Sequence, residues 1–183
     1  IYTAWYAAQG AGAVAPSSGP NSGTGLAAIY YDNADFTGSF VKRTDPTIDF
    51  DWGGDRPDAL IGADSFTARW SGQVEAPGTG TYTFRVGSDD GTRLWVNGKL
   101  LVNNWVDQDF TYRGGAVDLV QNQRYDVVVE YLQSAGGAKV QLRWDGPGTG
   151  GDAVVPQSRL YSVAGGAGDV AMIAVESGPP QVT

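Results

Sequence analysis

The sequence predicts an all-β protein, an antiparallel β-sandwich of jelly-roll-like character. Apolar and polar residues alternate along several stretches, glycine-rich segments separate these stretches, and no apolar stripe of helical period lasts beyond a turn or two. Alternation with a period of two places one face of a strand on a core and leaves the other toward solvent. Many short strands joined by glycine-rich turns are typical of a sandwich.

The alternating stretches define the individual strands. The clearest are "SFTARWSGQV" at 65–74, "TYTFRV" at 81–86, "RYDVVVEY" at 124–131 and "KVQLRW" at 139–144. Between "RLWV" and "KLLV" stands Asn97-Gly98, a dipeptide that tolerates the positive φ angles of a tight turn. It therefore predicts a hairpin. Most of the tryptophans are expected in the core, because aromatic side chains mostly serve packing.

The length of 183 residues suits one domain with short tails. Residues 25–162 are expected to form the sandwich. Residues 1–24 are predicted to be a linker whose apolar start could pair with a sheet edge, and residues 163–183 a second linker with one strand at 169–175. No basic-then-apolar signal opens the chain, so we expect it to be a piece of a longer protein.

Composition excludes several classes of function. Twenty acidic residues stand against twelve Lys and Arg, a net charge of −8 that argues against a nucleic-acid partner. The sequence contains no cysteine and no histidine, which removes disulfides, thiolate chemistry and imidazole bases or ligands. Any metal must be held by oxygens, which favours calcium or magnesium. No apolar run reaches membrane-spanning length, so membrane insertion is not expected.

The segment "GSDDGT", residues 87–92, places two carboxylates side by side. On a regular strand Asp89 and Asp90 would point to opposite faces, so they can share an ion only if the peptide between them is kinked or cis. A calcium ion would offset their repulsion but needs about six to eight oxygens. The loop "QSAGGA", residues 133–138, offers the amide oxygen of Gln133 and the carbonyls of Ala135 and Gly137. The alternative is a hydrated Asp-Asp-Gly turn.

A resemblance sharpens this hypothesis. "GLAAIYYDNADFTG", "IDFDW", "TYTFRVGSDDGTRLWVNGKL", "VVEYLQSAGGAKVQLRW" and "VVPQSRLY" follow one another as in the anthrax protective-antigen-type (fourteen-kilodalton) domain family, which the chain resembles over about residues 25–162. The resemblance implies a β-sandwich. In the lectin members of the family, as in bacterial adhesins and yeast flocculins, an Asp-Asp pair joined by a cis peptide holds calcium, and vicinal sugar hydroxyls complete its shell.

Carried over residue by residue, the resemblance assigns calcium to the Asp89–Asp90 pair and to a second loop. Asp89 and Asp90 match the pair. The second-loop ligands match Gln133, Ala135 and Gly137, although flocculins generally have Asn where Gln133 stands. The expected sugar-binding residues are Asp89, Asp90, Gln133, Ser134 and Gly137, with Trp105 at the rim.

The favoured function is a calcium-dependent lectin module of a large secreted or cell-surface bacterial adhesin, monomeric as an isolated domain. It would bind vicinal hydroxyls of hexose or fucose-like sugars on cell-surface glycans. An enzyme is not expected, because a glycoside hydrolase needs two carboxylates roughly 5–9.5 Å apart in divided roles, and Glu75, Glu130 and Glu176 are not placed beside Asp89. The alternatives are a structural spacer and an accessory carbohydrate-binding domain of a glycoside hydrolase.

Two further motifs carry weaker hypotheses. "DFDWGGDRPD" spaces four aspartates as a calcium loop could, but lacks the downstream Glu of an EF-hand, so a solvated structural segment is preferred. "GPGTGGD" resembles a phosphate-binding loop in composition only, because no Lys-Ser/Thr pair follows it.

Overall fold

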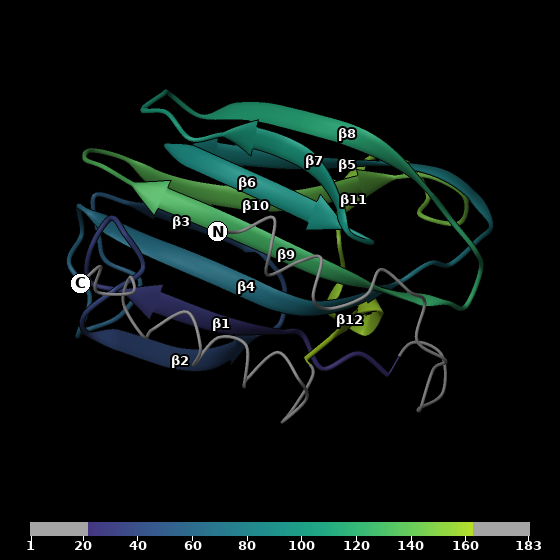
Figure 1. Ribbon diagram of the computed structural model, residues 1–183, viewed down its shortest axis with the longest axis horizontal. Helices are drawn as coiled ribbons and strands as arrows, with labels where there is room; N and C mark the ends of the chain where they lie inside the picture. The colour runs from purple at the N-terminus through teal and green to yellow at the C-terminus, as the bar shows by residue number, and fades with distance from the viewer. Residues whose placement is uncertain (1–21, 163–183) are drawn as a thin grey trace, which may run out of the picture.

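The computed structural model describes residues 22–162, which form two antiparallel sheets packed face to face (Figure 1). The predicted all-β sandwich is confirmed. The two terminal linkers, with the apolar start and the candidate strand at 169–175, lie outside the described residues except for residues 22–24 and so stay predictions. Within the described range, no helix is long and apolar enough to span a membrane.

The larger sheet has seven strands. Its order is β2 (Phe40–Asp45), β1 (Leu26–Tyr31), β4 (Phe66–Glu75), β9 (Arg124–Gln133), β6 (Gly91–Val96) and β7 (Lys99–Asn104), and β12 (Leu160–Tyr161) pairs with β4. The smaller sheet has five: β11 (Ala153–Val154), β10 (Ala138–Asp145), β5 (Gly80–Asp89) and β8 (Thr111–Leu119), with β3 (Asp49–Gly53) on β10. A short 3₁₀ turn, η1 (Gln157–Arg159), precedes β12.

The core lies between the sheets, where the predicted alternation directs the apolar side chains. Phe84 and Val86 of the smaller sheet and Val127 and Val129 of the larger sheet are all fully buried. The tryptophans behave as expected: Trp70, Trp95 and Trp144 are buried, and Trp52 is partly buried against the same core.

The predicted hairpin is present between β6 and β7. Asn97 and Gly98 adopt φ angles of 50° and 76°, the positive values that a tight two-residue turn requires. The turn pairs Val96 with Lys99, so β6 and β7 run side by side at one edge of the larger sheet.

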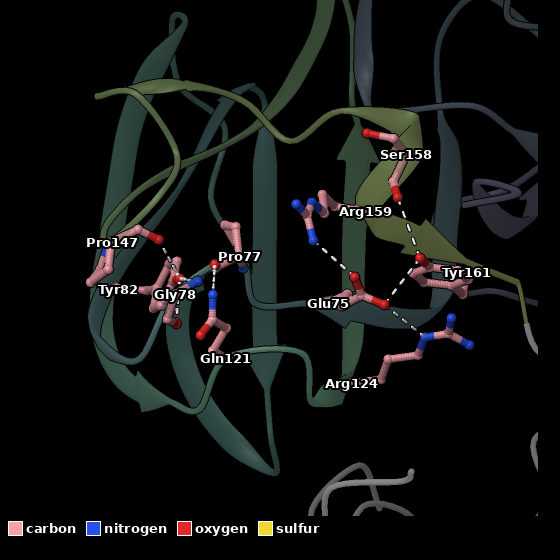
Figure 2. A network of polar contacts seen from close by, with 10 residues as sticks. All are labelled: Glu75, Pro77, Gly78, Tyr82, Gln121, Arg124, Pro147, Ser158, Arg159 and Tyr161. Carbon is pink, nitrogen blue, oxygen red and sulfur yellow. Dashed lines mark hydrogen bonds and ion pairs between the residues drawn. The ribbon is translucent and has the colours of Figure 1, made fainter. Parts of the chain in front are cut away.

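The register of β4 on β9 defines two ends of the sandwich. Glu75 pairs with Arg124 at one end and Phe66 with Gln133 at the other. Figure 2 shows the first end. The buried carboxylate of Glu75 accepts hydrogen bonds from Arg159 at 2.8 Å, Arg124 at 3.3 Å and the Tyr161 hydroxyl at 3.1 Å. This network joins η1 and β12 to β4 and β9.

A second polar contact closes the same end (Figure 2). The Tyr82 hydroxyl accepts the Gly78 N–H at 2.9 Å and lies 2.6 Å from the Pro147 carbonyl oxygen. Gln121 donates to the Pro77 carbonyl at 3.1 Å. The loops at this end are therefore fixed by contacts within the protein. β5 terminates at the opposite end, where Asp89 is its last residue.

Replacing Glu75 by Gln should lower the free energy of unfolding by about 3 kcal/mol, because Arg124 and Arg159 would lose the carboxylate that compensates their buried charge. Denaturant unfolding followed by tryptophan fluorescence measures the loss. The matched control is Asp152→Asn, which removes an exposed carboxylate paired with Arg143 at 3.3 Å and should cost less than about 1 kcal/mol. Equal losses in the two variants would contradict the structural role of Glu75.

Candidate functional site

The Asp89–Asp90 pair lies where the chain crosses from one sheet to the other. β5 of the smaller sheet ends at Asp89, and β6 of the larger sheet begins at Gly91. The peptide bond between the two aspartates is cis, the arrangement that the family resemblance implies. Both carboxylates therefore lie at the end of the sandwich opposite the Glu75 network.

Asp90 is buried, with 5% of its surface exposed, and its carboxylate holds two loops. Oδ1 accepts the backbone N–H of Gln108 at 3.0 Å, and Oδ2 accepts that of Ser134 at 2.8 Å. Gln108 lies in the β7–β8 loop and Ser134 in the β9–β10 loop. A carboxylate offers about four lone-pair sites, so each oxygen keeps capacity for a cation after accepting one N–H.

Asp89 is half-buried and borders the glycine loop. A Cβ placed on Gly137 would lie 3.3 Å from Oδ2 of Asp89, so this glycine keeps the carboxylate uncovered on that side. Burial raises the pKa of Asp89, and the negative charges of Asp90 and Asp109 raise it further. Its cross-strand neighbour Lys139 directs its ammonium to Asp51 at 2.8 Å instead. Its surroundings thus disfavour the ionised form of Asp89, and a bound cation would stabilise that form.

Gln133 is fully buried at the end of β9, on the same face of the strand as Tyr131. The Tyr131 hydroxyl contacts the Asp89 carbonyl oxygen and lies 2.7 Å from Oε1 of Gln133. Burial, then the charges of Asp89 and Asp90, raise the pKa of Tyr131, so the hydroxyl keeps its single proton. One proton cannot serve two acceptors.

The opposite orientation of the Gln133 amide removes this conflict. As placed, Nε2 of Gln133 is a buried donor without a hydrogen-bond partner among the described residues, which is unfavourable. With oxygen and nitrogen exchanged, Nε2 donates to the Tyr131 hydroxyl, and the hydroxyl donates to the Asp89 carbonyl. The amide oxygen then occupies the buried position at which Nε2 has no acceptor among the described residues. Such an oxygen, at the end that carries the aspartates, is a hard ligand suited to calcium.

The rest of the second loop is held from both sides. Ser134 donates its hydroxyl to Asp107 at 2.6 Å, and its carbonyl accepts the N–H of Ser65 at 3.0 Å. The N–H of Gly136 donates to Asp64 at 3.0 Å. Ala135 lies at the exposed tip of this loop. The structure thus brings Gln133, Ser134 and Gly137 to the aspartate pair and fixes the loop that carries them.

The backbone of Trp105 lies close to the Asp89–Asp90 pair, but its ring packs against other residues. The Cα atom of Trp105 is 3.3 Å from the point where a side chain on Gly91 would begin. Its ring centroid is 5.7 Å from that of Phe36, and the Arg93 guanidinium lies 4.1 Å from the ring centroid. The ring is partly buried by these contacts, which limits the face it offers to a sugar.

Sequence reasoning missed the residues that support the site from other loops: Gln108, Asp107, Asp109, Asp64 and Tyr131. The acidic pair in "WVDQDF" was a usable signal, because Asp107 and Asp109 flank a residue that contacts Asp90. Nothing local marks Asp64, which reaches the second loop from the segment before β4.

No group of three or more Asp, Glu, His or Cys side chains suited to a metal occurs among residues 22–162. An ion at the aspartate pair would take its remaining oxygens from the Gln133 amide, main-chain carbonyls and solvent or ligand. In "DFDWGGDRPD", Asp49 and Asp51 lie on β3 and contact Gln141 and Lys139, which agrees with a structural segment.

Comparison with known proteins identifies the family. The PA14 domain matches residues 22–158. The chain belongs to the PA14 domain family. It is 41% identical over 140 residues to the anti-sigma-I factor RsgI3 of Acetivibrio thermocellus, a match that covers 76% of this chain and 22% of that protein.

Solved structures share the fold. An anti-sigma factor domain-containing protein from Clostridium clariflavum is 35% identical with a TM-score of 0.71, covering 76% of this chain and 47% of that chain. A PA14 sugar-binding domain from an RTX adhesin is 19% identical with a TM-score of 0.60. The match covers 78% of this chain and 100% of that chain. The chain spans less than half the length of the two anti-sigma relatives.

Replacing Asp90 by Ala should destabilise the domain by about 3 kcal/mol, because the partly buried N–H groups of Gln108 and Ser134 would lose a charged acceptor. Thermal or denaturant unfolding measures the loss, and amide exchange at Gln108 and Ser134 should accelerate. Asp107→Ala is the matched control: it removes an exposed acceptor from the same neighbourhood and should cost less than about 1 kcal/mol. Unchanged exchange at both amides in the Asp90 variant would contradict this role.

Proposed function

We propose that this PA14 domain is a calcium-dependent carbohydrate-binding module that recognises vicinal hydroxyls of hexose or fucose-like sugars. The observation that carries the proposal is the set of oxygens at the sheet crossing. Asp89 and Asp90 meet there beside a buried Gln133 amide that has an unpartnered atom. Two carboxylates, an amide oxygen and loop carbonyls are the ligands that calcium prefers.

Each residue then has a distinct part in binding. Asp90 positions the loops and shares the ion, and Asp89 contributes the more exposed carboxylate. The Gln133 amide oxygen and the carbonyls of Ala135 and Gly137 supply neutral ligands. Calcium would orient two adjacent sugar hydroxyls by exchanging water for them, so the affinity of one site for a monosaccharide should be weak. Useful binding would arise from many copies or from longer ligands.

The contacts of the glutamates favour a binding module over a glycoside hydrolase. Glu75 is held by two arginines and Tyr161, and Glu130 by Arg69 at 2.9 Å and Arg93 at 3.1 Å. Both carboxylates are therefore engaged in structural ion pairs. Glu176 lies outside the described residues. No pair of carboxylates with divided acid and base roles follows from these contacts.

The parent protein has two candidate contexts. A large secreted or cell-surface bacterial adhesin remains the first, in which repeated modules attach the cell to glycans. The 41% identity to an anti-sigma-I factor favours a second. There the sugar-binding module would be one part of a larger anti-sigma factor. Both contexts use the same sugar site, and so would an accessory domain of a glycoside hydrolase.

Calcium affinity provides the first test. Asp89→Asn should weaken calcium binding by more than about 100-fold, beyond the range typical of changes outside the ligand shell. The matched control is Asp109→Asn, which removes a neighbouring negative charge outside the proposed ligand set and should weaken binding less than about fivefold. Isothermal titration calorimetry measures both. Equal effects would point to diffuse electrostatic attraction in place of a ligand site.

A glycan panel, probed with calcium and again with excess chelator, tests the ligand class. Binding should be confined to sugars with adjacent, suitably oriented hydroxyls and should disappear with chelator and in Asp89→Asn. If calcium raises the melting temperature but no glycan on the panel binds, the structural spacer becomes the better hypothesis, because the ion would then act only on stability.

A further inference from the structure

An aromatic pair covers part of the outer face of the smaller sheet, next to Asp89. Phe110 and Tyr112 stand at the start of β8, and their ring centroids are 5.1 Å apart in an edge-to-face arrangement. Tyr112 is 41% exposed, one of the few large apolar side chains so exposed among the described residues. An aromatic ring held open to solvent is a common feature of binding surfaces.

Gly87 makes room for this pair. A Cβ at Gly87 would lie 2.5 Å from Tyr112 Cε1 and 2.6 Å from Phe110 Cζ, distances that no real side chain could occupy. Gly87 pairs with Tyr112 on one side and with Gln141 on the other. The Tyr112 hydroxyl donates to Oε1 of Gln141, so the tyrosine side chain reaches across β5 to the next strand and is fixed at both ends.

Polar side chains surround the rings in two rows across the sheet. In the first row, Gln141 donates its amide N–H to Asp49 at 2.5 Å. In the second, Lys139 lies between Asp89 and Asp51 in the register and places its ammonium 4.9 Å from the Phe110 ring centroid. Fixed donors and acceptors beside an aromatic ring match a pyranose, which has apolar C–H faces and hydroxyls around its rim.

We propose that Phe110, Tyr112, Lys139, Gln141 and Asp49, here called the outer platform, form a second sugar subsite. The inference rests on the proposed function, because it extends the ligand from a monosaccharide at calcium to an oligosaccharide. Gly87 and Asp89 are two residues apart on one face of β5, about 7 Å along the strand. The platform and the calcium site are therefore neighbours, and one short glycan chain spans both.

The charges of the outer platform indicate a neutral glycan. Lys139 is neutralised by Asp51, and the amide of Gln141 is engaged by Asp49. An anionic sugar would have to compete with these carboxylates for the same cation and amide donor. Neutral hydroxyls can join the existing hydrogen bonds without that repulsion.

Matched monosaccharide and tetrasaccharide probes test the platform: glucose with cellotetraose, mannose with mannotetraose, and galactose with galactotetraose. For at least one pair, the tetrasaccharide should bind about three- to tenfold tighter than its monosaccharide, the range expected for one aromatic contact. Tyr112→Ala should remove that gain and leave monosaccharide binding unchanged, whereas Tyr112→Phe should keep most of it. Phe40→Ala, at a 43% exposed ring on the other sheet, is the matched control and should have no effect.

The outcomes separate this inference from the proposed function. If no tetrasaccharide gains over its monosaccharide, or if the gain survives Tyr112→Ala in a variant that melts like the parent, the platform is overturned while the calcium site can stand. If Tyr112-dependent tetrasaccharide binding persists in chelator and in Asp89→Asn, the platform is supported and the calcium-dependent function fails. Self-association that disappears in Tyr112→Ala and is not displaced by any probe would assign the surface to protein contact and overturn the inference.

Discussion

The hydrogen bonds to the carboxylate of Asp90 are the contacts on which the site end of the sandwich depends. They are made at the point where the chain leaves one sheet for the other, and they fix the β7–β8 loop through Gln108 and the β9–β10 loop through Ser134. Hydrogen bonds to an ionised acceptor are stronger than neutral ones. Asp90 is buried in this role, whereas Asp89 is only half-buried, so the two neighbouring carboxylates differ in their exposure to a ligand.

The carboxylates at the two ends of the sandwich have neighbours of opposite charge. At one end Glu75 is compensated by Arg124 and Arg159, whose guanidinium groups complete the charge balance within the protein. At the other end the charges that act on Asp89 come from Asp90 and Asp109 and are negative. The first arrangement is self-sufficient and suits a structural anchor. A cation bound at the second end would offset the repulsion among these carboxylates, which is the physical basis for proposing calcium there.

Sequence reasoning predicted the local features and missed the contacts between distant segments. Period-two alternation located the principal strands, and Asn97-Gly98 located a hairpin, because both depend on neighbours in the chain. The aspartate pair was visible for the same reason. The support from Gln108 and Asp64 depends on which loops the sheet order brings together. The orientation of the Gln133 amide depends on the Tyr131 hydroxyl, which has one proton to donate and two neighbouring oxygens. The Tyr112 contact with Gln141 depends on cross-strand register over Gly87. Apart from the acidic residues on either side of Gln108, none of these contacts has a local signature.

Gly137, beside the Asp89 carboxylate, bears on whether an ion bound there would be open to a ligand or enclosed by protein. Gly137 leaves one side of the Asp89 carboxylate uncovered. Two residues before Asp89 on the same face of β5, Gly87 leaves room for the rings of Phe110 and Tyr112, which pack over it. A cation needed only for stability is best enclosed by protein oxygens, and a larger residue at position 137 would reach the Asp89 carboxylate and help to enclose it. A calcium ion at Asp89 would keep coordination positions for solvent on the Gly137 side, and solvent at calcium exchanges readily for hydroxyl oxygens. The shape of the backbone around Asp89 thus favours a sugar-binding module over a spacer, whichever larger protein carries it.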